Sequence, residues 1–511
     1  MGAVGLTALC RRIGAPYPPL LALSGAALAF APSGPEIHIE PELALTLFLA
    51  PVLLEAAYHT SPRDLWRNFV PLTSLALVAV LLTAAVVAFI GWRMGGLPVA
   101  AAAALGAVVS PPDSAAATAS LSPLRLPRRI RHLLSGESLL NDATALILYR
   151  ISVRLAVGHA ALGEVGHVPL VIMLGSPLAG FALAQAQAML TGRVRDAPSF
   201  TVLGLVGVFG VWLLAERMGL SPLVTVVVYG LTLGRVLPTR VSARNRVSSA
   251  SVAETLGFVL TVLAIVIMGL QARQIVERFS RAELGHAVQL AVTVLAAVVL
   301  VRLGYVMAYN TAVRLKNRWL GVKLPPGMGA PTAKSGLVIS WCGMRGMVTL
   351  AGAFALPEGF PGRDLIVFCA FFVVLGTLTL QGFTLKALVK ALRLRPDTSV
   401  EQEVAAGRSA MLQAALERLA SETSPAIGAV REHYEAAQAV TRHGETAQEA
   451  TEHDRLRLLA LTAERREIER LRKAAEIGEE AFHRLEAELD WAELDAAPAG
   501  YFQPLRSEGD V

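Results

Sequence analysis

The sequence predicts an all-α polytopic membrane protein with about 13 transmembrane helices and a helical C-terminal tail. Composition is one reason: of the 511 residues, 54% are hydrophobic and only 17% are charged, with a mean hydropathy of +0.53. A typical soluble domain carries about 25% charged residues. Segment length is the other reason, because many apolar runs approach the roughly 20 residues that a helix needs to cross the hydrocarbon layer.

Apolar segments follow one another through the first 391 residues, separated by short polar loops. The predicted spans are 1–10, 17–32, 41–58, 69–91, 97–122, 134–156, 168–190, 198–215, 221–237, 255–270, 285–310, 334–356 and 364–391. The first, MGAVGLTALC, is too short to cross a bilayer by itself. This indicates either an incomplete N-terminus or the choice of a later start codon.

Arginine and lysine concentrate in alternate loops, which the positive-inside rule places in the cytoplasm. These residues are Arg11, Arg12, Arg63, Arg67, Arg125, Arg128, Arg129, Arg131, Arg193, Arg195, Arg240, Arg244, Arg246, Arg314, Lys316, Arg318 and Lys323. An odd number of spans then leaves the N-terminus outside and the C-terminus in the cytoplasm. We expect a multi-pass protein of the cell inner membrane, with lipid as its main surroundings.

The composition changes at residue 396, which predicts a transmembrane domain over 1–395 and a cytoplasmic helical domain over 396–511. Residues 401–511 hold 13 Arg or Lys against 23 Asp or Glu, whereas residues 1–400 hold 33 against 17. Apolar residues recur at helical spacing in this acidic tail, which favours amphipathic helices. Regulation, dimer contact and a simple helical appendage all remain open for it. The charge split needs no nucleic acid to explain it.

Several function classes lack their sequence signals. The three cysteines, Cys10, Cys342 and Cys369, show no CxxC spacing, so a disulfide framework or thiolate metal site is not expected. No GxxxxGK[ST] phosphate loop is present, so no nucleotide is required. No Ser/His or metal constellation accompanies the buried acids, which argues against an intramembrane hydrolase. We expect no cofactor, no catalytic residues and no enzymatic activity.

Five ionisable residues lie inside predicted spans, where each costs roughly 2.5–3.5 kcal/mol on insertion scales and is therefore a functional hypothesis. They are Glu55, Asp113, Glu137, Asp142 and Arg345. Arg302 is a further intramembrane charge for which the sequence specifies no partner.

The segment GESLLND is the most informative. Four-residue spacing stacks Glu137 over Asn141 and Ser138 over Asp142 on one helix face. At about 1.5 Å per residue, Asp142 lies roughly 12 Å into a helix that starts near residue 134, close to the middle of the membrane. The alternative is a paired carboxylate that only holds helices together.

The segment SPPDSAA predicts a broken helix. Pro111 and Pro112 remove two N–H donors inside an Ala/Val-rich span and free carbonyls at membrane depth. Asp113 follows the break and can cap the broken ends. Together with a second polar helix this fits the discontinuous helices of transporters, although a simple proline kink with a capping Asp remains open.

Arg345 lies in the centre of span 334–356 and needs an acidic partner. We predict a structural ion pair with Glu137, which leaves Asp142 available for exchange. Glu55 either ligates a cation or lies near the cytoplasmic water line beside His59.

At these residues the sequence resembles the bacterial sodium/proton exchangers of the first monovalent cation/proton antiporter family. The motifs are FLAPVLLEAA, SPPDSAAATA, GESLLNDATALILY and WCGMRGMVTLAGAFALP, and the similarity covers residues 10–395. The resemblance implies inverted repeats, two crossed broken helices and a homodimer. It also implies that Asp142 binds both ions, that Asn141, Ser138, Asp113, Glu55 and Pro112 belong to the site, and that Glu137 pairs with Arg345. The family commonly has Thr-Asp-Pro-Val-Ala where this chain has Pro112 to Ala116, which removes the threonine's contribution.

The function expected from these residues is exchange of Na+, or of K+ or Li+, for H+, serving intracellular pH and sodium homeostasis. The cation would be held by Asp142, Ser138 and Glu55 together with carbonyls of the broken helix. One titrating carboxylate, with Asn141 and not a second acid before it, predicts electroneutral exchange. A cation channel and a membrane sensor with a vestigial ion site are the alternatives. A channel would favour a repeated pore motif, which the sequence lacks.

Overall fold

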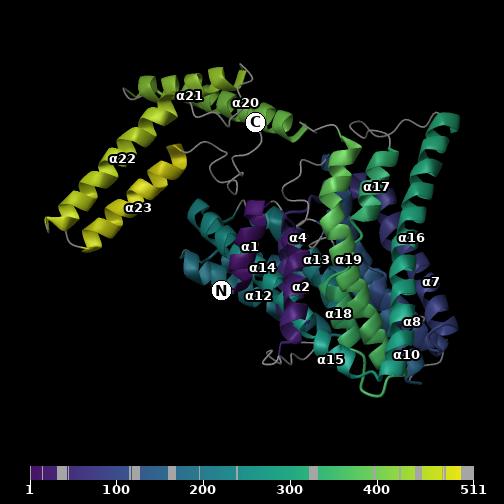
Figure 1. Cartoon of the computed structure of the whole chain (residues 1–511). Coiled ribbons are helices and arrows are strands. Elements are labelled where there is room, and N and C mark those ends of the chain that lie inside the picture. Colours follow the sequence, from purple (N-terminus) through teal and green to yellow (C-terminus); the bar gives the residue numbers. More distant parts are fainter. Residues whose placement is uncertain are drawn as a thin grey trace. The chain divides into compact units, whose positions relative to one another are not determined.

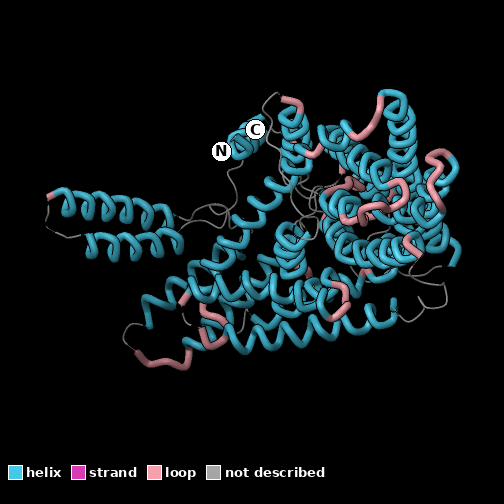
Figure 2. The backbone as a smooth tube through the Cα atoms, turned by 90° about the horizontal axis from the view of Figure 1, so that it is seen from below, coloured by secondary structure: helices cyan, strands magenta, loops and turns pink. Residues whose placement is uncertain are grey.

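The structure is a computed structural model that describes all residues except 1, 14, 32–42, 44, 114–116, 118–126, 159–167, 195, 238–239, 321–331, 395–398, 425–426, 443–451, 475, 477–478 and 497–511. The described residues form helices joined by turns and loops, with no strand among them, as Figure 2 shows. The predicted all-α class is therefore confirmed. The chain divides into two compact units, 1–396 and 397–511.

Each predicted span overlaps a helix or consecutive helices of the first unit (Figure 1), and residues 114–116 and 118–122 of span 97–122 lie outside the described residues. In order these are α1 (Gly2–Ile13), α2 (Tyr17–Ala29), η1 (Leu45–Leu49), α4 (Ala50–Tyr58), α5 (Pro62–Arg67), α6 (Phe69–Thr73), η2 (Ser74–Ala79), α7 (Val80–Arg93), α8 (Val99–Val109), α10 (Arg128–Ala156), α11 (Val168–Thr191), α12 (Ala197–Arg217), α13 (Pro222–Val236), α14 (Ala243–Leu270), α15 (Ala272–Glu277), α16 (Arg281–Leu320), α17 (Ala333–Trp341), α18 (Met347–Phe354) and α19 (Arg363–Leu392). The count of 13 crossings stays a prediction.

Five segments of the described chain are long and apolar enough to cross a membrane as single helices. They are Phe69–Arg93, Ala197–Arg217, Ala243–Glu277, Arg281–Trp319 and Arg363–Leu392. Shorter apolar helices accompany them, among them α8 and α13. The first unit is thus a multi-pass membrane domain, in which α16 and α19 lie side by side (Figure 1).

Polar caps set where several of these helices begin. The Asp196 carboxylate accepts the Ser199 N–H at 2.9 Å at the start of α12. Ser221 caps α13, whose first residue is proline. Thr332 and Ser335 form a reciprocal capping box at the start of α17. These side chains accept N–H groups that the first turn of a helix leaves without a partner.

The first unit contains two large clusters of buried apolar side chains, and α10 contributes to both. One cluster joins α2, α7, α8, α14, α16, α17 and α19, and α10 adds Ile130, Leu133 and Leu134 to it. The other joins α4, α11, α12 and α13, and α10 adds Leu139. Because Glu137, Asn141 and Asp142 lie on α10, the predicted site falls between the two clusters.

The second unit consists of α20 (Ser399–Leu419), α21 (Ile427–Arg442), α22 (Glu452–Lys473) and α23 (Glu479–Ala496). Helices α22 and α23 pack against each other (Figure 1). Arg465 of α22 pairs with Asp490 and Glu493 of α23, and Arg457 pairs with Asp495 at 2.9 Å. The helical tail that the sequence predicts is present.

Close packing of α8 on α7 depends on Gly106, because a Cβ there would overlap the backbone carbonyl of Ala84. We predict that Gly106→Ala lowers the free energy of unfolding in detergent by about 1–3 kcal/mol. The matched control is Gly204→Ala on α12, where a Cβ meets no atom within 4 Å. Alanine there should be neutral or stabilising by up to about 1 kcal/mol. Equal thermal stability of the two variants would contradict this packing.

Candidate functional site

Helix α8 ends where the sequence predicts a break. It stops at Val109, and the next residues, 110–113, are not helical. The two prolines of this segment cannot donate to the carbonyls of Ala107 and Val108, which lose their usual helical partners. The Ser110 hydroxyl donates to the Ala107 carbonyl at 3.2 Å instead. The predicted continuation through residues 114–116 lies outside the described residues.

A second break interrupts the predicted span 334–356. Helix α17 ends at Trp341, α18 begins at Met347, and residues 342–346 between them are not helical. The two breaks touch, since the backbone N–H of Asp113 donates to the carbonyl of Met344 at 2.7 Å. Within the described residues, the end of α8 therefore contacts the break in span 334–356, whereas the inverted repeats and the crossing of two broken helices stay predictions.

The Arg345 guanidinium lies at the meeting point of the two breaks and is fully buried, with 1% of its surface exposed. Its Nε donates to the carbonyl of Val109 at 3.0 Å and its Nη2 to that of Ser110 at 3.1 Å. Its Nη1 donates to the carbonyl of Gly343. A positive charge at the negative C-terminal end of α8 is also favoured by the helix dipole.

The predicted pair between Glu137 and Arg345 is wrong, because Glu137 binds Arg302 instead. Arg302 Nη1 donates to Glu137 Oε1 at 2.5 Å and Nη2 to Oε2 at 2.9 Å. Both side chains are buried, and Arg302 also donates to the carbonyl of Ile339 at 3.2 Å. Three backbone carbonyls accept hydrogen bonds from Arg345, and both carboxylate oxygens of Glu137 accept from the arginine of α16.

Asn141 connects α10 to the first break. Its Nδ2 donates to the carbonyl of Pro112 at 2.9 Å, and its side chain is fully buried. The structure thus brings together two residues of the predicted site. The next residue, Asp142, is also buried, with 5% of its surface exposed. The negative charge of Asp113 acts on the Asp142 carboxylate, and the two like charges repel each other.

Asp113 lies against the start of α18. A Cβ at Gly346, the residue before this helix, would overlap the Asp113 carboxyl group. The carboxylate therefore approaches the N-terminal end of α18, where the helix dipole favours negative charge. Ser138 lies one turn before Asp142 on α10 and is half-buried, so its place in the site rests on this spacing.

Glu55 lies on α4, and its carboxylate packs against Gly257 of α14, where a Cβ would overlap it. The charge of Glu254 on the same helix acts on it. No hydrogen bond or ion pair within the described residues joins Glu55 to Asp142. Its role as a cation ligand stays a prediction.

Two contacts of the site were not predicted. Arg302 is a single arginine in the apolar span 285–310. A charge in such a span indicates a residue that needs a partner, but nothing in the sequence selected Glu137 as that partner. Thr377 of α19 accepts the backbone N–H of Arg345 at 3.0 Å. A single threonine in an apolar span gives no signal of such a role.

We predict that Arg302→Ala lowers the free energy of unfolding by about 3–5 kcal/mol, because it leaves the Glu137 carboxylate buried without its partner. Adding Glu137→Gln should restore part of the loss, since the amide carries no charge. Thermal unfolding of the purified variants measures both effects.

Arg278→Ala is the matched control, because it breaks an ion pair with Asp364 in which both side chains are about half exposed. The effect there should stay within about 1 kcal/mol. The pairing is refuted if Arg302→Ala is no more destabilising than this control, or if Glu137→Gln deepens its effect.

Sequence comparison connects this geometry to known proteins. A family described as "Sodium/hydrogen exchanger, transmembrane" matches residues 2–391. A Na+/H+ exchanger of Mycobacterium tuberculosis is 34% identical over 80% of this chain and 76% of its own length. The Na+/H+ exchanger YjcE of Escherichia coli is 30% identical over 94% of this chain and 93% of its own length.

The fold is also similar to a solved structure. The sodium proton antiporter MjNhaP1 of Methanocaldococcus jannaschii at pH 8 aligns with a TM-score of 0.56 at 20% identity, over 77% of this chain and 96% of its own. The family match spans most of the chain and includes both broken helices and α10. The chain therefore belongs to the sodium/hydrogen exchanger family.

Proposed function

We propose that this chain exchanges Na+ for H+ across the membrane and that both ions occupy the Asp142 carboxylate in turn. One observation carries the proposal. Four charged side chains are buried within the described residues, namely Glu137, Asp142, Arg302 and Arg345. Glu137 and Arg302 neutralise each other, and Arg345 is held by carbonyls. Asp142 alone has neither an ion pair nor a hydrogen bond among the described residues.

An unpartnered carboxylate in this position costs about 2.5–3.5 kcal/mol on insertion scales, and a cation or a proton removes that cost. The conformational change that moves the site from one side of the membrane to the other is therefore unfavourable while the site is empty and charged. This limits the leak of ions. The carbonyl of Pro112, held by Asn141, and the hydroxyl of Ser138 are oxygen ligands suited to a small cation. Glu55 completes the proposed set.

The position of α10 suits alternating access. Its buried apolar residues divide between the two hydrophobic clusters, so a relative shift of the clusters would expose Asp142 to one side and then to the other. The gradient of one ion drives the other. The chain then needs no nucleotide, no cofactor and no catalytic residue, and it acts as a transporter and not as an enzyme.

Na+ is the proposed main substrate, with K+ and Li+ as competing cations. Relatives support both Na+ as the substrate and the other cations as competitors. NhaS1 of Synechocystis is a low-affinity Na+/H+ antiporter, 30% identical over 76% of this chain and 72% of its own length. A protein of Bacillus subtilis, 29% identical over 73% of this chain and 58% of its own, is a sodium, potassium, lithium and rubidium/H+ antiporter. Exchange would serve pH and sodium homeostasis.

We further propose a homodimer in the cell inner membrane with the N-terminus outside and the C-terminus in the cytoplasm. The alternation of basic loops supports this orientation. Residues 1–395 would form the antiporter domain. The acidic helices after residue 396 would lie in the cytoplasm.

We predict that Asp142→Asn reduces Na+-driven proton flux in liposomes to the rate of protein-free vesicles. The amide keeps the size of the side chain but cannot trade a proton for a cation. Asp364→Asn is the control, because its side chain is half exposed and pairs only with Arg278 among the described residues. It should keep the wild-type rate. Substantial flux through folded Asp142→Asn would overturn the assignment.

We also predict one-for-one exchange without net charge movement, because a single titrating carboxylate carries one positive charge each way. Net charge transfer would gain about 2.3 kcal/mol per elementary charge per 100 mV. Na+-driven flux should therefore be the same under inside-negative and inside-positive valinomycin potentials. A rate that follows the sign of the potential would mean that Asp113 or Glu55 cycles together with Asp142.

A further inference from the structure

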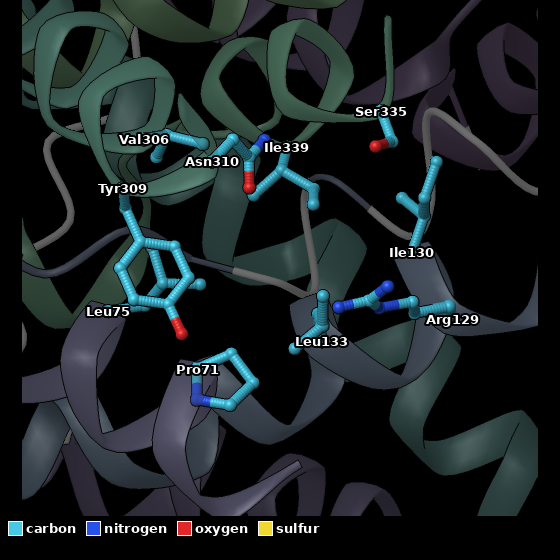
Figure 3. A pocket seen from close by; sticks show the side chains of 10 residues that line it. All are labelled: Pro71, Leu75, Arg129, Ile130, Leu133, Val306, Tyr309, Asn310, Ser335 and Ile339. Carbon is cyan, nitrogen blue, oxygen red and sulfur yellow. The ribbon is translucent and has the colours of Figure 1, made fainter. Parts of the chain in front are cut away.

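A second polar site lies on α10, far from Asp142. It is a partly enclosed pocket of about 30 Å³ between the start of α10, the end of α16 and the segments that begin at Phe69 and Ala333. Its lining residues are Pro71, Leu75, Arg129, Ile130, Leu133, Val306, Tyr309, Asn310, Ser335 and Ile339 (Figure 3). Arg129 and Asp142 are 13 residues apart on one helix, or about 20 Å. The pocket is thus separate from the proposed ion site.

The polar lining of the pocket favours an anion. Arg129 supplies a guanidinium, Tyr309 and Ser335 supply hydroxyls, and no lining residue is acidic. Figure 3 shows the Arg129 guanidinium reaching over Leu133 toward the middle of the pocket, with the Tyr309 ring on the opposite side. Asn310 also lines the wall and is 6% exposed, but its amide nitrogen lies against Gly336 of α17.

Helix ends add to this preference. Arg129 is the second residue of α10, Ser335 the third of α17, and Pro71 the third of the span Phe69–Arg93. Three helices therefore begin at the pocket, and the N-terminal end of a helix carries partial positive charge. Anions commonly bind where such ends meet a basic side chain.

The apolar part of the lining distinguishes a lipid from a small soluble anion. Six of the ten lining residues are hydrophobic or proline. Trp66 and Phe69, just before Pro71, are 76% and 52% exposed and stack with ring centroids 5.7 Å apart. Exposed aromatic side chains of this kind mark the headgroup level of a bilayer. A volume of about 30 Å³ exceeds the roughly 10–15 Å³ that one water molecule needs, so the pocket has room for a small polar group such as the oxygens of a phosphate.

We propose that this pocket binds the phosphate group of an anionic phospholipid through Arg129 and Tyr309. Basic pockets between transmembrane helices bind lipid headgroups in this way. The pocket adjoins the buried ion pair: Leu133 precedes Glu137 by one turn, Val306 follows Arg302 by one turn, and the Ile339 carbonyl accepts from Arg302. A bound phosphate contacts α10 and α16, the helices that carry this ion pair, and stabilises their packing.

The test is thermal unfolding of the full chain in phosphatidylcholine nanodiscs, with and without phosphatidylglycerol, and with inorganic phosphate as a third arm. Phosphatidylglycerol should raise the Tm of the wild type by several degrees. Arg129→Gln should lose most of that increment. Arg131→Gln, an exposed neighbour on α10 that does not line the pocket, should keep it.

Each increment is taken against the same variant in phosphatidylcholine alone, so a lower baseline stability does not obscure it. Tyr309→Phe, which removes only a hydroxyl, replaces Arg129→Gln if that variant does not fold, and it should also reduce the increment. Equal increments in the wild type, the pocket variant and Arg131→Gln would overturn the site. An equal rise with inorganic phosphate alone would overturn the lipid as its ligand.

Discussion

Backbone carbonyls that lose their helical partners inside an apolar interior need other donors, because water is not available to them there. At the end of α8 and at the break between α17 and α18, several of these carbonyls accept hydrogen bonds from side chains or from the backbone of the other segment. Arg345 donates hydrogen bonds to the carbonyls of Val109, Ser110 and Gly343. Asn141 donates to the carbonyl of Pro112, and the backbone N–H of Asp113 donates to the carbonyl of Met344. The breaks thereby hold each other in place.

This use of Arg345 determines the remaining charges. The donors of Arg345 face carbonyls, and Glu137 pairs with Arg302. The absence of a side chain at Gly343 leaves room for the Arg302 side chain. Gly346 makes the same room for the Asp113 carboxyl at the start of α18. Asp142 is the buried charged residue that has no hydrogen-bond or ion-pair partner among the described residues. An acid of this kind is suited to bind and release cations.

Most of the fold could be predicted from the sequence, because long apolar segments and two adjacent prolines are local signals. The break before α18 was harder to place. Span 334–356 is apolar throughout, and Gly343 and Gly346 suggest close helix approach as readily as a break. The resemblance to the exchangers placed Asn141 and Pro112 in one site, and the structure shows the hydrogen bond between them.

The choice of partners could not be predicted in the same way. Arg302 and Arg345 are both single arginines in apolar spans, and which one reaches Glu137 depends on the packing of α16 against α17. The packing of Glu55 against Gly257 is likewise a contact between helices far apart in the sequence. Charge burial identifies such residues, but only the tertiary arrangement pairs them.

The central claim is that Na+ and H+ compete for the Asp142 carboxylate. Its most direct test is the affinity of the purified protein for Na+, measured by calorimetry over a series of pH values. Competition at one carboxylate predicts that, in the acidic range, the apparent Kd for Na+ rises about tenfold for each unit by which pH falls, with one proton released per Na+ bound. A Kd that stays constant with pH, or Na+ binding without proton release, would contradict the account.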